Sequence, residues 1–356
     1  HCKLIDDIYY NFFYTDTSNE FPHGDYGTVD LVMLVPGCHD GKRMDTFLAN
    51  TFNSKAHNVQ NGCQWEQGMQ RQIKFEGIYC FLDQAPSIYD KFIIELYTDM
   101  SSLFSWSQME FLKMWSQKKN EAKRVPLFCG YKIPNGETRW QVAMLKANDF
   151  PIKSEKTRCG GRPIIKKMFT KTLIDWATPY NCSYNYFFGR GSLPSKVAEK
   201  KTLIIGIGAI GSMVATTLVR CGAKYLDYYD VDLKEPGNIC RSDYDFLSGV
   251  SDKTYELSSI LHSISPFVQC EIPSKALDSG IKQSIDNERI KKTVQEVLNR
   301  YDIIFDCSTD DGLMYALDKL NLKAKVINLS ISNHANEIVC AIGSNIAKTI
   351  KLLFSQ

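Results

Sequence analysis

The sequence predicts an α/β protein in which a doubly wound mixed sheet over residues 186–356 follows a second α/β domain over residues 1–185. Three observations support this prediction. The chain has 356 residues, 44% of them hydrophobic, which is enough for two cores. After Lys200, apolar strands alternate with amphipathic helices. A glycine-rich turn in "KTLIIGIGAIGSMVATTLVR" joins the first of those strands to the first helix.

The first domain is expected to combine strands and helices. Its predominantly apolar runs predict strands over 28–36, 77–83, 91–97 and 139–146. Apolar residues at helical spacing predict helices over 42–52 and 103–117, and polar composition predicts loops over 116–124 and 153–163. Because the domain lacks a phosphate-binding glycine turn, we expect it to bind no nucleotide and to support assembly or partner docking.

The second domain is expected to begin with a strand–helix–strand unit. Its apolar runs predict strands over 202–206, 225–230, 301–306, 325–330 and 337–342. Amphipathic spacing predicts helices over 210–221, 251–263, 288–299 and 311–320. This alternation is typical of a sheet covered by helices on both faces.

Composition and charge narrow the possible functions. The formal net charge of +2 gives nucleic acid no broad basic face, and no apolar run is long enough to cross a bilayer. Twelve scattered cysteines without a C-x-x-C pair are expected to be reduced thiols, and no zinc spacing is present. We therefore expect a soluble, cytoplasmic protein without nucleic-acid or membrane partners. The chain opens with His1 instead of Met, so we expect it to be part of a longer protein.

The glycine turn predicts an anion site at a helix N-terminus. Gly206, Gly208 and Gly211 allow a tight turn in which backbone N–H groups approach a phosphate. Asp230 ends the next strand, where a carboxylate suits the hydroxyl groups of a ribose. These features alone fit NAD as well as ATP.

The residues after that strand favour a triphosphate. In "YYDVDLKEPGNICRSDY" (228–244), Asp232 is followed by Asn238 and Arg241, and Lys253 lies a short distance beyond. A carboxamide, a guanidinium and an ammonium group near one turn are what a triphosphate needs, because its roughly four negative charges must be neutralised before another anion can attack. A dehydrogenase would leave these three side chains without a role.

These motifs, in this order, resemble the adenylation domain of ubiquitin-activating enzymes and of the bacterial ThiF, MoeB and HesA proteins. The resemblance covers about 185–345 and includes a lead-in with Arg190 and the segments "GIGAIG", "DVD", "NICR", "SDKTYEL", "SISP" and "DCSTDD". There are departures from the family pattern. Ser242 stands where the family usually has Gln, the glycine before the lysine is displaced, and the last segment has one extra residue.

The resemblance implies a Rossmann-like, ThiF-type domain that uses ATP and Mg²⁺ to adenylate the C-terminal carboxylate of a ubiquitin-like protein. By this resemblance the nucleotide is bound by Gly206, Gly208, Gly211, Asp230, Asp232, Asn238, Arg241 and Lys253. The implied catalytic residues are Arg241, Lys253, Asp310 and Arg190. Asp310, with Asp311 as the alternative, would hold Mg²⁺, and Arg190 would act on the partner protomer of a homodimer.

The resemblance also implies partners. They are the tail of a ubiquitin-like protein and a downstream conjugating enzyme, and bacterial members linked to phage defence suggest an antiviral pathway. Larger family members carry an inactive adenylation-like half before the active one, which is our expectation for residues 1–185. We assign no thioester cysteine, because Cys240 is expected to serve local packing and Cys340 to be buried in its strand.

Several other functions stay open. The chain fits a ThiF- or MoeB-like enzyme that adenylates a sulfur-carrier protein, and less well one that acts on a modified tRNA adenosine. An NAD(P)-dependent oxidoreductase and a non-catalytic scaffold are the alternatives outside this activity.

Overall fold

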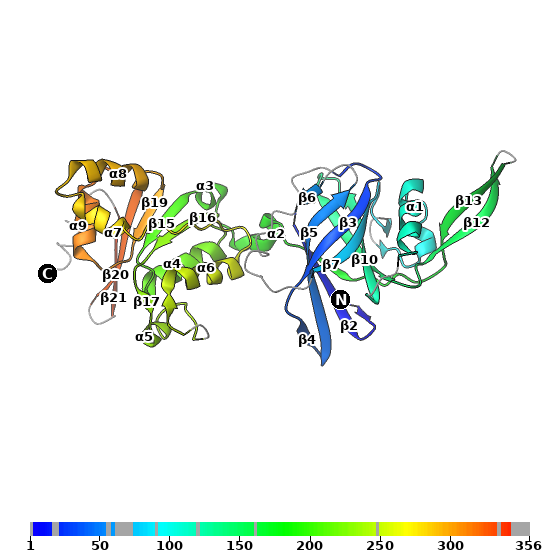
Figure 1. The fold of residues 1–356 in the computed structure, drawn as a ribbon, viewed down its shortest axis with the longest axis horizontal. Coiled ribbons are helices and arrows are strands. Elements are labelled where there is room, and N and C mark those ends of the chain that lie inside the picture. The colour runs from blue at the N-terminus through cyan, green and yellow to red at the C-terminus, as the bar shows by residue number, and fades with distance from the viewer. Residues whose placement is uncertain are drawn as a thin grey trace. The chain divides into compact units, whose positions relative to one another are not determined.

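A division after Phe187 separates the chain into two units, His1–Phe187 and Phe188–Gln356. The expected boundary lies two residues before this division. The computed structural model describes residues 3–15, 21–54, 58–60, 74–89, 92–118, 122–159, 162–246, 249–332 and 336–342. Each unit is described by itself (Figure 1).

The first unit is built on a ten-stranded sheet with both parallel and antiparallel pairs. Its main path is β1 (Leu4–Ile5), β2 (Ile8–Tyr14), β5 (Lys42–Ser54), β3 (Tyr26–Met33), β7 (Lys74–Phe81), β10 (Arg124–Lys132) and β11 (Thr138–Lys146). Three further strands pair at its sides: β4 (Gly37–His39), β6 (Asn58–Gln60) and β14 (Thr178–Asn181). The remaining elements are β8 (Ser87–Ile88), β9 (Phe92–Ile93), η2 (Tyr97–Met100), α1 (Trp106–Trp115), β12 (Ile152–Cys159) and β13 (Arg162–Phe169).

Both faces of this sheet are buried. Along β7, Ile78 and Cys80 point into one apolar cluster, which also holds residues of α1, and Tyr79 and Phe81 point into another. This alternation follows from the two-residue period of a strand. An apolar core therefore lies on each face of the sheet.

The sheet curls, so that strands distant in its order meet. Phe52 of β5 stacks on Trp140 of β11 at a ring separation of 4.6 Å, although β3, β7 and β10 lie between them in the sheet. The segment before β14 joins the two edges. The Ala177 N–H donates to the carbonyl of Val142 in β11, and β14 then pairs with β2. The second core consequently lies inside the curl and is rich in aromatic rings.

Some expected elements of this unit are wrong. Residues 42–52 belong to the thirteen-residue strand β5, because backbone pairing with β2 and β3 outweighs the helical spacing of its apolar residues. The expected loop over 153–163 is largely the antiparallel pair β12–β13. In the expected strand over 91–97, only β9 is a strand, and η2 begins at Tyr97.

The second unit has a five-stranded sheet in the order β16 (Tyr225–Tyr229), β15 (Lys201–Ile205), β19 (Ile303–Asp306), β20 (Lys325–Ser332) and β21 (Glu337–Ile342). The first four strands are parallel and β21 is antiparallel. One apolar cluster packs the sheet against α4 (Ala209–Arg220) and α6 (Lys253–Ile264). A separate cluster packs it against α7 (Leu277–Gln283), α8 (Glu288–Leu298) and α9 (Asp311–Lys319).

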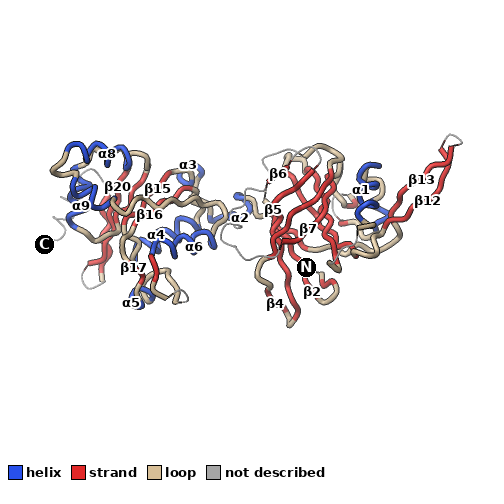
Figure 2. The backbone as a smooth tube through the Cα atoms, viewed as in Figure 1, coloured by secondary structure: helices blue, strands red, loops and turns tan. Residues whose placement is uncertain are grey.

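Helices therefore cover both faces of the second sheet, and the predicted fold class is confirmed (Figure 2). The expected helices and strands of this unit agree with the structure to within about two residues at most ends. Sequence reasoning missed α7. It also missed the short elements β17 (Leu233–Lys234), α5 (Pro236–Ile239) and β18 (Ser251–Asp252), and the lead-in elements α2 (Tyr184–Phe188), η3 (Gly189–Gly191) and α3 (Ser195–Ala198).

No helix among the described residues is long and apolar enough to cross a membrane. The nine cysteines whose side chains the structure describes are free thiols. Cys340 is exposed, which corrects the expectation that it is buried, because β21 lies at the edge of the sheet.

Replacing Trp140 tests the aromatic core of the first unit. Trp140→Ala removes a ring that is 2% exposed, so we expect the unfolding free energy of this unit to fall by about 3–5 kcal/mol. Trp106→Ala, at a residue that is 71% exposed, is the matched control and should change it by less than about 0.5 kcal/mol. Urea unfolding followed by circular dichroism measures both. Similar losses in the two variants would contradict the curled core.

Candidate functional site

A cavity of about 930 Å³ lies at the glycine turn of the second unit. The sheet order places this turn at a switch point, because the chain moves from β15 to β16 on one side and returns to β19 on the other. Ligands of open α/β sheets bind at the carboxyl ends of strands at such a point. Seven predicted residues line the cavity, namely Gly206, Gly208, Asp230, Asp232, Asn238, Arg241 and Lys253.

The three glycines of the turn have different structural reasons. Gly206 has a φ of +81°, and an added Cβ would lie 2.6 Å from the Cα of Ser308, so the turn needs glycine here. At Gly211 a Cβ would lie 1.9 Å from the carbonyl oxygen of Gly206, so this glycine packs α4 against the turn and does not line the cavity. A Cβ at Gly208 would meet nothing within 4 Å. Its missing side chain therefore leaves open space at the start of α4.

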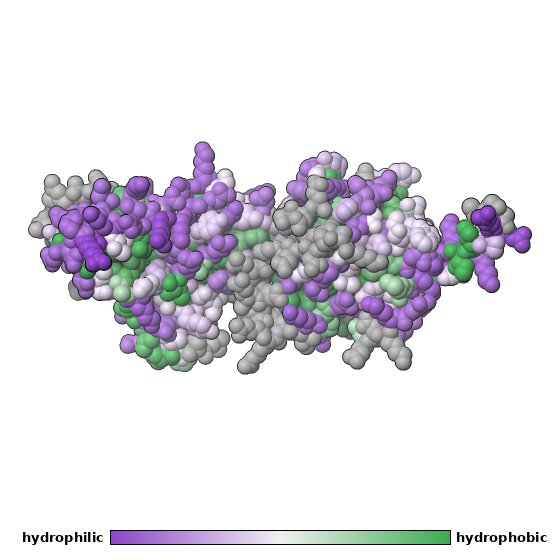
Figure 3. Space-filling model, turned by 45° about the horizontal axis from the view of Figure 1, so that its top comes forward, coloured by the Kyte–Doolittle hydropathy of each residue, from purple (hydrophilic) through white to green (hydrophobic). Residues whose placement is uncertain are grey.

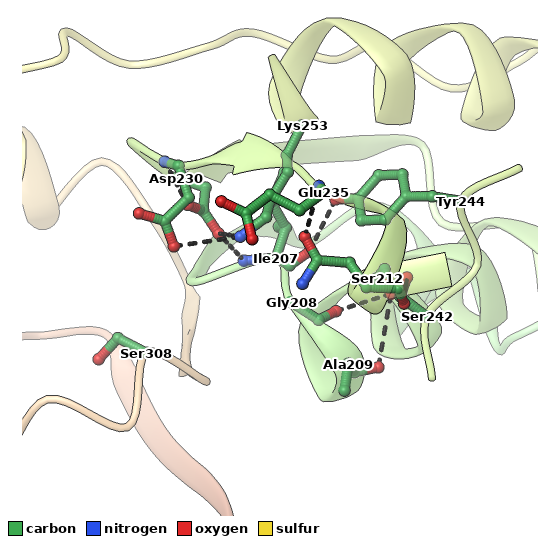
Figure 4. A network of polar contacts seen from close by, with 12 residues as sticks. Ile207, Gly208, Ala209, Ser212, Asp230, Glu235, Ser242, Tyr244, Lys253 and Ser308 are labelled. Atoms are coloured by element: carbon green, nitrogen blue, oxygen red, sulfur yellow. Dashed lines mark hydrogen bonds and ion pairs between the residues drawn. The ribbon is translucent and has the colours of Figure 1, made fainter. Parts of the chain in front are cut away.

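The carboxylate of Asp230 holds the turn in place (Figure 4). It accepts hydrogen bonds from the backbone N–H of Ile207 at 2.9 Å and of Asp232 at 2.8 Å. The ammonium group of Lys253, the first residue of α6, lies 3.8 Å from Asp230 and 3.1 Å from Asp232. The Lys253 side chain is 6% exposed, so both carboxylates neutralise a nearly buried cation beside the cavity.

Two polar side chains of the cavity come from the short helix α5 and the residues just after it. Asn238 caps this helix, since its side-chain oxygen accepts from the N–H of Glu235 at 2.9 Å. Arg241 follows the helix and is exposed toward the cavity. Its guanidinium group is thus available to a ligand, and the Asn238 amide oxygen is already used by the cap.

Hydrogen bonds to the glycine turn and to α5 hold the segment after α5. The buried Tyr244 hydroxyl donates to the carbonyl of Ile207 at 2.7 Å, which ties this segment to the glycine turn (Figure 4). Ser242 donates to the carbonyl of Asn238 at 2.5 Å. The departure from the family pattern at this position therefore serves local structure. Beneath β17, the Lys234 ammonium and the Glu256 carboxylate form a buried ion pair at 2.6 Å.

Sequence reasoning missed the apolar side of the cavity. It is lined by Ile210, Met213, Val214, Thr217 and Leu218 of α4 and by Ile331 and Ile338. The α4 residues have the spacing i, i+3, i+4, i+7 and i+8, which is a second stripe beside the buried residues of the same helix. A helix that is apolar on two sides was the signal available in the sequence.

The segment "DCSTDD" divides between two environments. Ser308 and Thr309 line the cavity, and Thr309 has a φ of 56°, which is unusual for a β-branched residue. Asp310 does not line the cavity. One of its oxygens caps α9 by accepting from the Leu313 N–H at 3.0 Å, and the other pairs with Lys282 at 2.6 Å. The hydrogen bond from Lys282 lowers the pKa of Asp310, so this carboxylate is ionised at neutral pH.

Asp306 lies behind this segment and is almost fully buried. Burial raises the pKa of its carboxyl group. The carboxylate accepts from the Ser308 hydroxyl at 2.6 Å and from the Asn328 amide at 2.9 Å, and it thereby fixes the loop that lines the cavity. Sequence reasoning assigned no role to Asp306.

Two other predicted residues lie outside the cavity lining. Arg190 is an exposed residue of η3. Asp311 is the exposed first residue of α9. Among the described residues no cluster of three or more His, Cys, Asp or Glu side chains is arranged to hold a metal ion.

The glycine turn, the switch-point cavity and the helices on both faces define a doubly wound α/β domain of the nucleotide-binding type. Residues 184–326 match the ThiF family. The predicted relationship to this superfamily is confirmed.

Two relatives extend this finding. The chain is 30% identical over 159 residues to the "ATP-dependent ubiquitin transferase-like protein Cap2" of Enterobacter hormaechei subsp. hoffmannii (strain UCI 50), with coverage of 45% of this chain and 25% of the relative. It is 33% identical over 78 residues to ubiquitin-like modifier-activating enzyme 5 of Caenorhabditis elegans, with coverage of 22% and 18%. The chain thus spans a quarter or less of the length of these relatives.

A solved structure with some similarity is that of E. coli MccB with ATP. Its sequence is 21% identical to this chain, the match covers 45% of this chain and 49% of MccB, and the TM-score is 0.34.

Replacing two of the glycines by alanine tests which one is needed for packing and which one only leaves open space. Gly211→Ala should lower the unfolding free energy of the second unit by about 1–3 kcal/mol, because backbone atoms 1.9 Å and 2.9 Å away block the new methyl group. Gly208→Ala is the control and should leave it within about 0.5 kcal/mol, since the methyl group meets open space. Thermal unfolding measures both. A destabilised Gly208→Ala with a stable Gly211→Ala would contradict the turn geometry.

Proposed function

We propose that the second unit uses ATP to adenylate the C-terminal carboxylate of a ubiquitin-like protein. The observation that carries this proposal is the convergence of Arg241, Lys253 and Asn238 on one cavity at the glycine turn. The match to the ThiF family and the similarity to proteins named for ubiquitin activation support the same reaction.

The chemistry requires two anions to meet. A carboxylate oxygen of the substrate attacks the α-phosphorus of ATP, the bond to the β-phosphate breaks, and pyrophosphate leaves with the acyl-adenylate as the other product. Arg241 and Lys253 would neutralise the phosphates, and the open space at Gly208 would let backbone N–H groups approach them. Catalysis would then consist mainly of positioning and charge neutralisation.

Lys253 gains a specific role in this proposal. Its ammonium group lies 3.1 Å from the carboxylate of Asp232, and the Asp232 side chain is 70% exposed. An entering triphosphate would compete for the ammonium group and leave Asp232 free to move into solvent. Asp230 would stay in place, because two backbone N–H groups hold its carboxylate, and could still meet the ribose.

We propose that Asp310 holds the Mg²⁺ ion that accompanies ATP. This ion is usually held by one or two carboxylates together with substrate phosphates, so one aspartate beside the lining residue Thr309 fits a metal that ATP brings. The Lys282 contact with Asp310 would have to open. Replacing Lys282 should then lower the Mg²⁺ concentration that half-maximal ATP binding requires, and replacing Asp310 should raise it.

A homodimer is part of the proposal, and the second stripe of α4 supports it. Met213 is 48% exposed and Ile338 is 75% exposed beside the cavity, which is apolar surface that a protein partner would cover. Arg190 lies outside the cavity lining of its own chain, so we propose that it reaches the phosphates bound by the partner protomer.

The wider setting is proposed from the resemblance. The activated protein would pass to a downstream conjugating enzyme, and the resemblance to bacterial family members linked to phage defence suggests an antiviral conjugation pathway. The first unit would support assembly or partner docking without binding nucleotide. A sulfur-carrier protein as substrate is the second candidate, because it would use the same cavity.

Arg241→Ala tests the nucleotide assignment. We expect the wild-type protein to be stabilised by Mg-ATP but not by NAD in thermal unfolding, and we expect ATP–pyrophosphate exchange with a ubiquitin-like protein that ends in glycine. Arg241→Ala should reduce that exchange by about 10- to 150-fold at unchanged melting temperature, since a guanidinium–phosphate contact contributes about 1.5–3 kcal/mol. Arg289→Ala, in α8 away from the cavity, is the control. Stabilisation by NAD alone would overturn the proposal.

Complementation tests the role of Arg190. Arg190→Ala and Arg241→Ala proteins, each inactive alone, should recover part of the exchange activity when their subunits are mixed, because one hybrid site would have both arginines. Subunit exchange is verified by native mass spectrometry. Hybrid dimers without any recovered activity would place Arg190 in cis or outside the reaction.

A further inference from the structure

The pair of strands β12 and β13 forms a basic ribbon, which we define as residues 152–159 and 162–169. It extends away from the sheet of the first unit (Figure 1). Its base is anchored, because Ile152 and Phe169 are buried in the core that α1 covers. With about 3.3 Å per residue, eight residues in each strand give a ribbon about 26 Å long.

Charge is concentrated on this ribbon. It holds six Lys or Arg residues and one Glu, a net charge of +5, although the whole chain has only +2. The rest of the chain therefore carries −3. The average charge of the protein conceals a strongly cationic arm, which is why composition did not point to it.

Most of these cations form no ion pair with the described residues. Lys153 pairs with Glu155 and Lys167 pairs with Glu110 of α1. The other four cations form no ion pair with the described residues: Lys156, Arg158, Arg162 and Lys166. Charges that only keep an exposed ribbon from aggregating can have either sign. A nearly uniform positive charge indicates an anionic partner.

The register places these cations on both faces of the ribbon. Lys156 lies opposite Ile165, and Arg158 lies opposite Pro163, on one face. Lys166 lies opposite Glu155, and Arg162 lies opposite Cys159, on the other. Residues directly opposite in an antiparallel pair share a face, so each face carries two of the four unpaired cations.

This two-sided arrangement decides the kind of partner. A flat acidic protein surface or an anionic membrane would be matched by cations on one face. A ribbon that is cationic on both faces suits a groove with negative charge on both walls. The major groove of B-form DNA is about 12 Å wide and admits a two-stranded ribbon, and phosphates line both of its sides.

We infer that the basic ribbon binds double-stranded DNA in the major groove, mainly through phosphates. Exposed apolar side chains accompany the charges, since Ile164 is 43% and Ile165 is 57% exposed, and they would contact base edges such as thymine methyl groups. Figure 3 shows this small hydrophobic group among hydrophilic residues at the protruding end. The inference uses residues of the first unit only and does not depend on the proposed adenylation.

Salt-dependent DNA binding tests the inference. The full chain is titrated into a labelled 20-base-pair duplex of mixed sequence, and anisotropy gives Kd between 50 and 200 mM KCl. Four unpaired cations predict a slope of log K against log salt of about −3 to −4, at about −0.9 for each phosphate contact. Lys156→Gln with Arg158→Gln should reduce the steepness by about 2 and weaken binding at least tenfold at 100 mM KCl.

A second double variant tests whether the effect is specific to the basic ribbon or follows from the total charge of the protein. Lys196→Gln with Lys292→Gln removes two exposed cations from the second unit and should leave the slope unchanged. Both double variants should keep the wild-type melting temperature. Absence of duplex binding at 50 mM KCl, or a ribbon variant with the wild-type slope, would overturn the inference.

Other anionic ligands test the alternatives to double-stranded DNA. Double-stranded RNA has a deep and narrow major groove, so it should bind more weakly than the DNA duplex of the same sequence. Polyglutamate and vesicles with 30% phosphatidylserine present anionic protein-like and membrane surfaces. Tighter binding to RNA, polyglutamate or vesicles than to the DNA duplex would reject the groove and indicate that partner instead.

Discussion

The hydrogen bonds of the Asp230 carboxylate hold the candidate site together. One oxygen accepts from the N–H of Ile207 in the glycine turn, and the other accepts from the N–H of Asp232. The same carboxylate lies 3.8 Å from the ammonium group of Lys253 at the start of α6. Three segments distant in sequence therefore meet at one side chain that is 8% exposed. Without this acceptor, two backbone donors and a nearly buried cation would lose their partner.

Helix α4 shows how one short element serves both the fold and the cavity. Its residues Gly211, Ala215 and Val219 pack under the sheet, where a larger group at Gly211 would strike the carbonyl of Gly206. The neighbouring stripe, which contains Met213 and Leu218, lines the cavity. A helix with two apolar stripes requires both to be shielded from water, and the sheet covers only one of them.

The second unit could be predicted from its sequence because its determinants are local. A strand, three glycines and a helix follow one another within 201–220, and the parallel strands β15 and β16 bring Gly206 and Asp230 to the same edge of the sheet. The first unit depends on pairings between distant segments. Residues 42–52 have helical spacing, yet they form β5 because β2 and β3 pair with it. The basic ribbon has too few apolar residues to be recognised as strands from its sequence. It forms because its two segments pair with each other.

Asp310 shows that a sequence motif does not by itself fix where a side chain lies. The motif placed an aspartate near the nucleotide, but its register depends on the extra residue in "DCSTDD". The structure accommodates this residue by turning Thr309 to a φ of 56°, which brings Thr309 into the cavity lining. Asp310 is then the N-cap of α9 and pairs with Lys282. The buried Asp306 accepts a hydrogen bond from the Ser308 hydroxyl and fixes the preceding bend, so the position of Asp310 is set by the whole loop and not by its place in the motif.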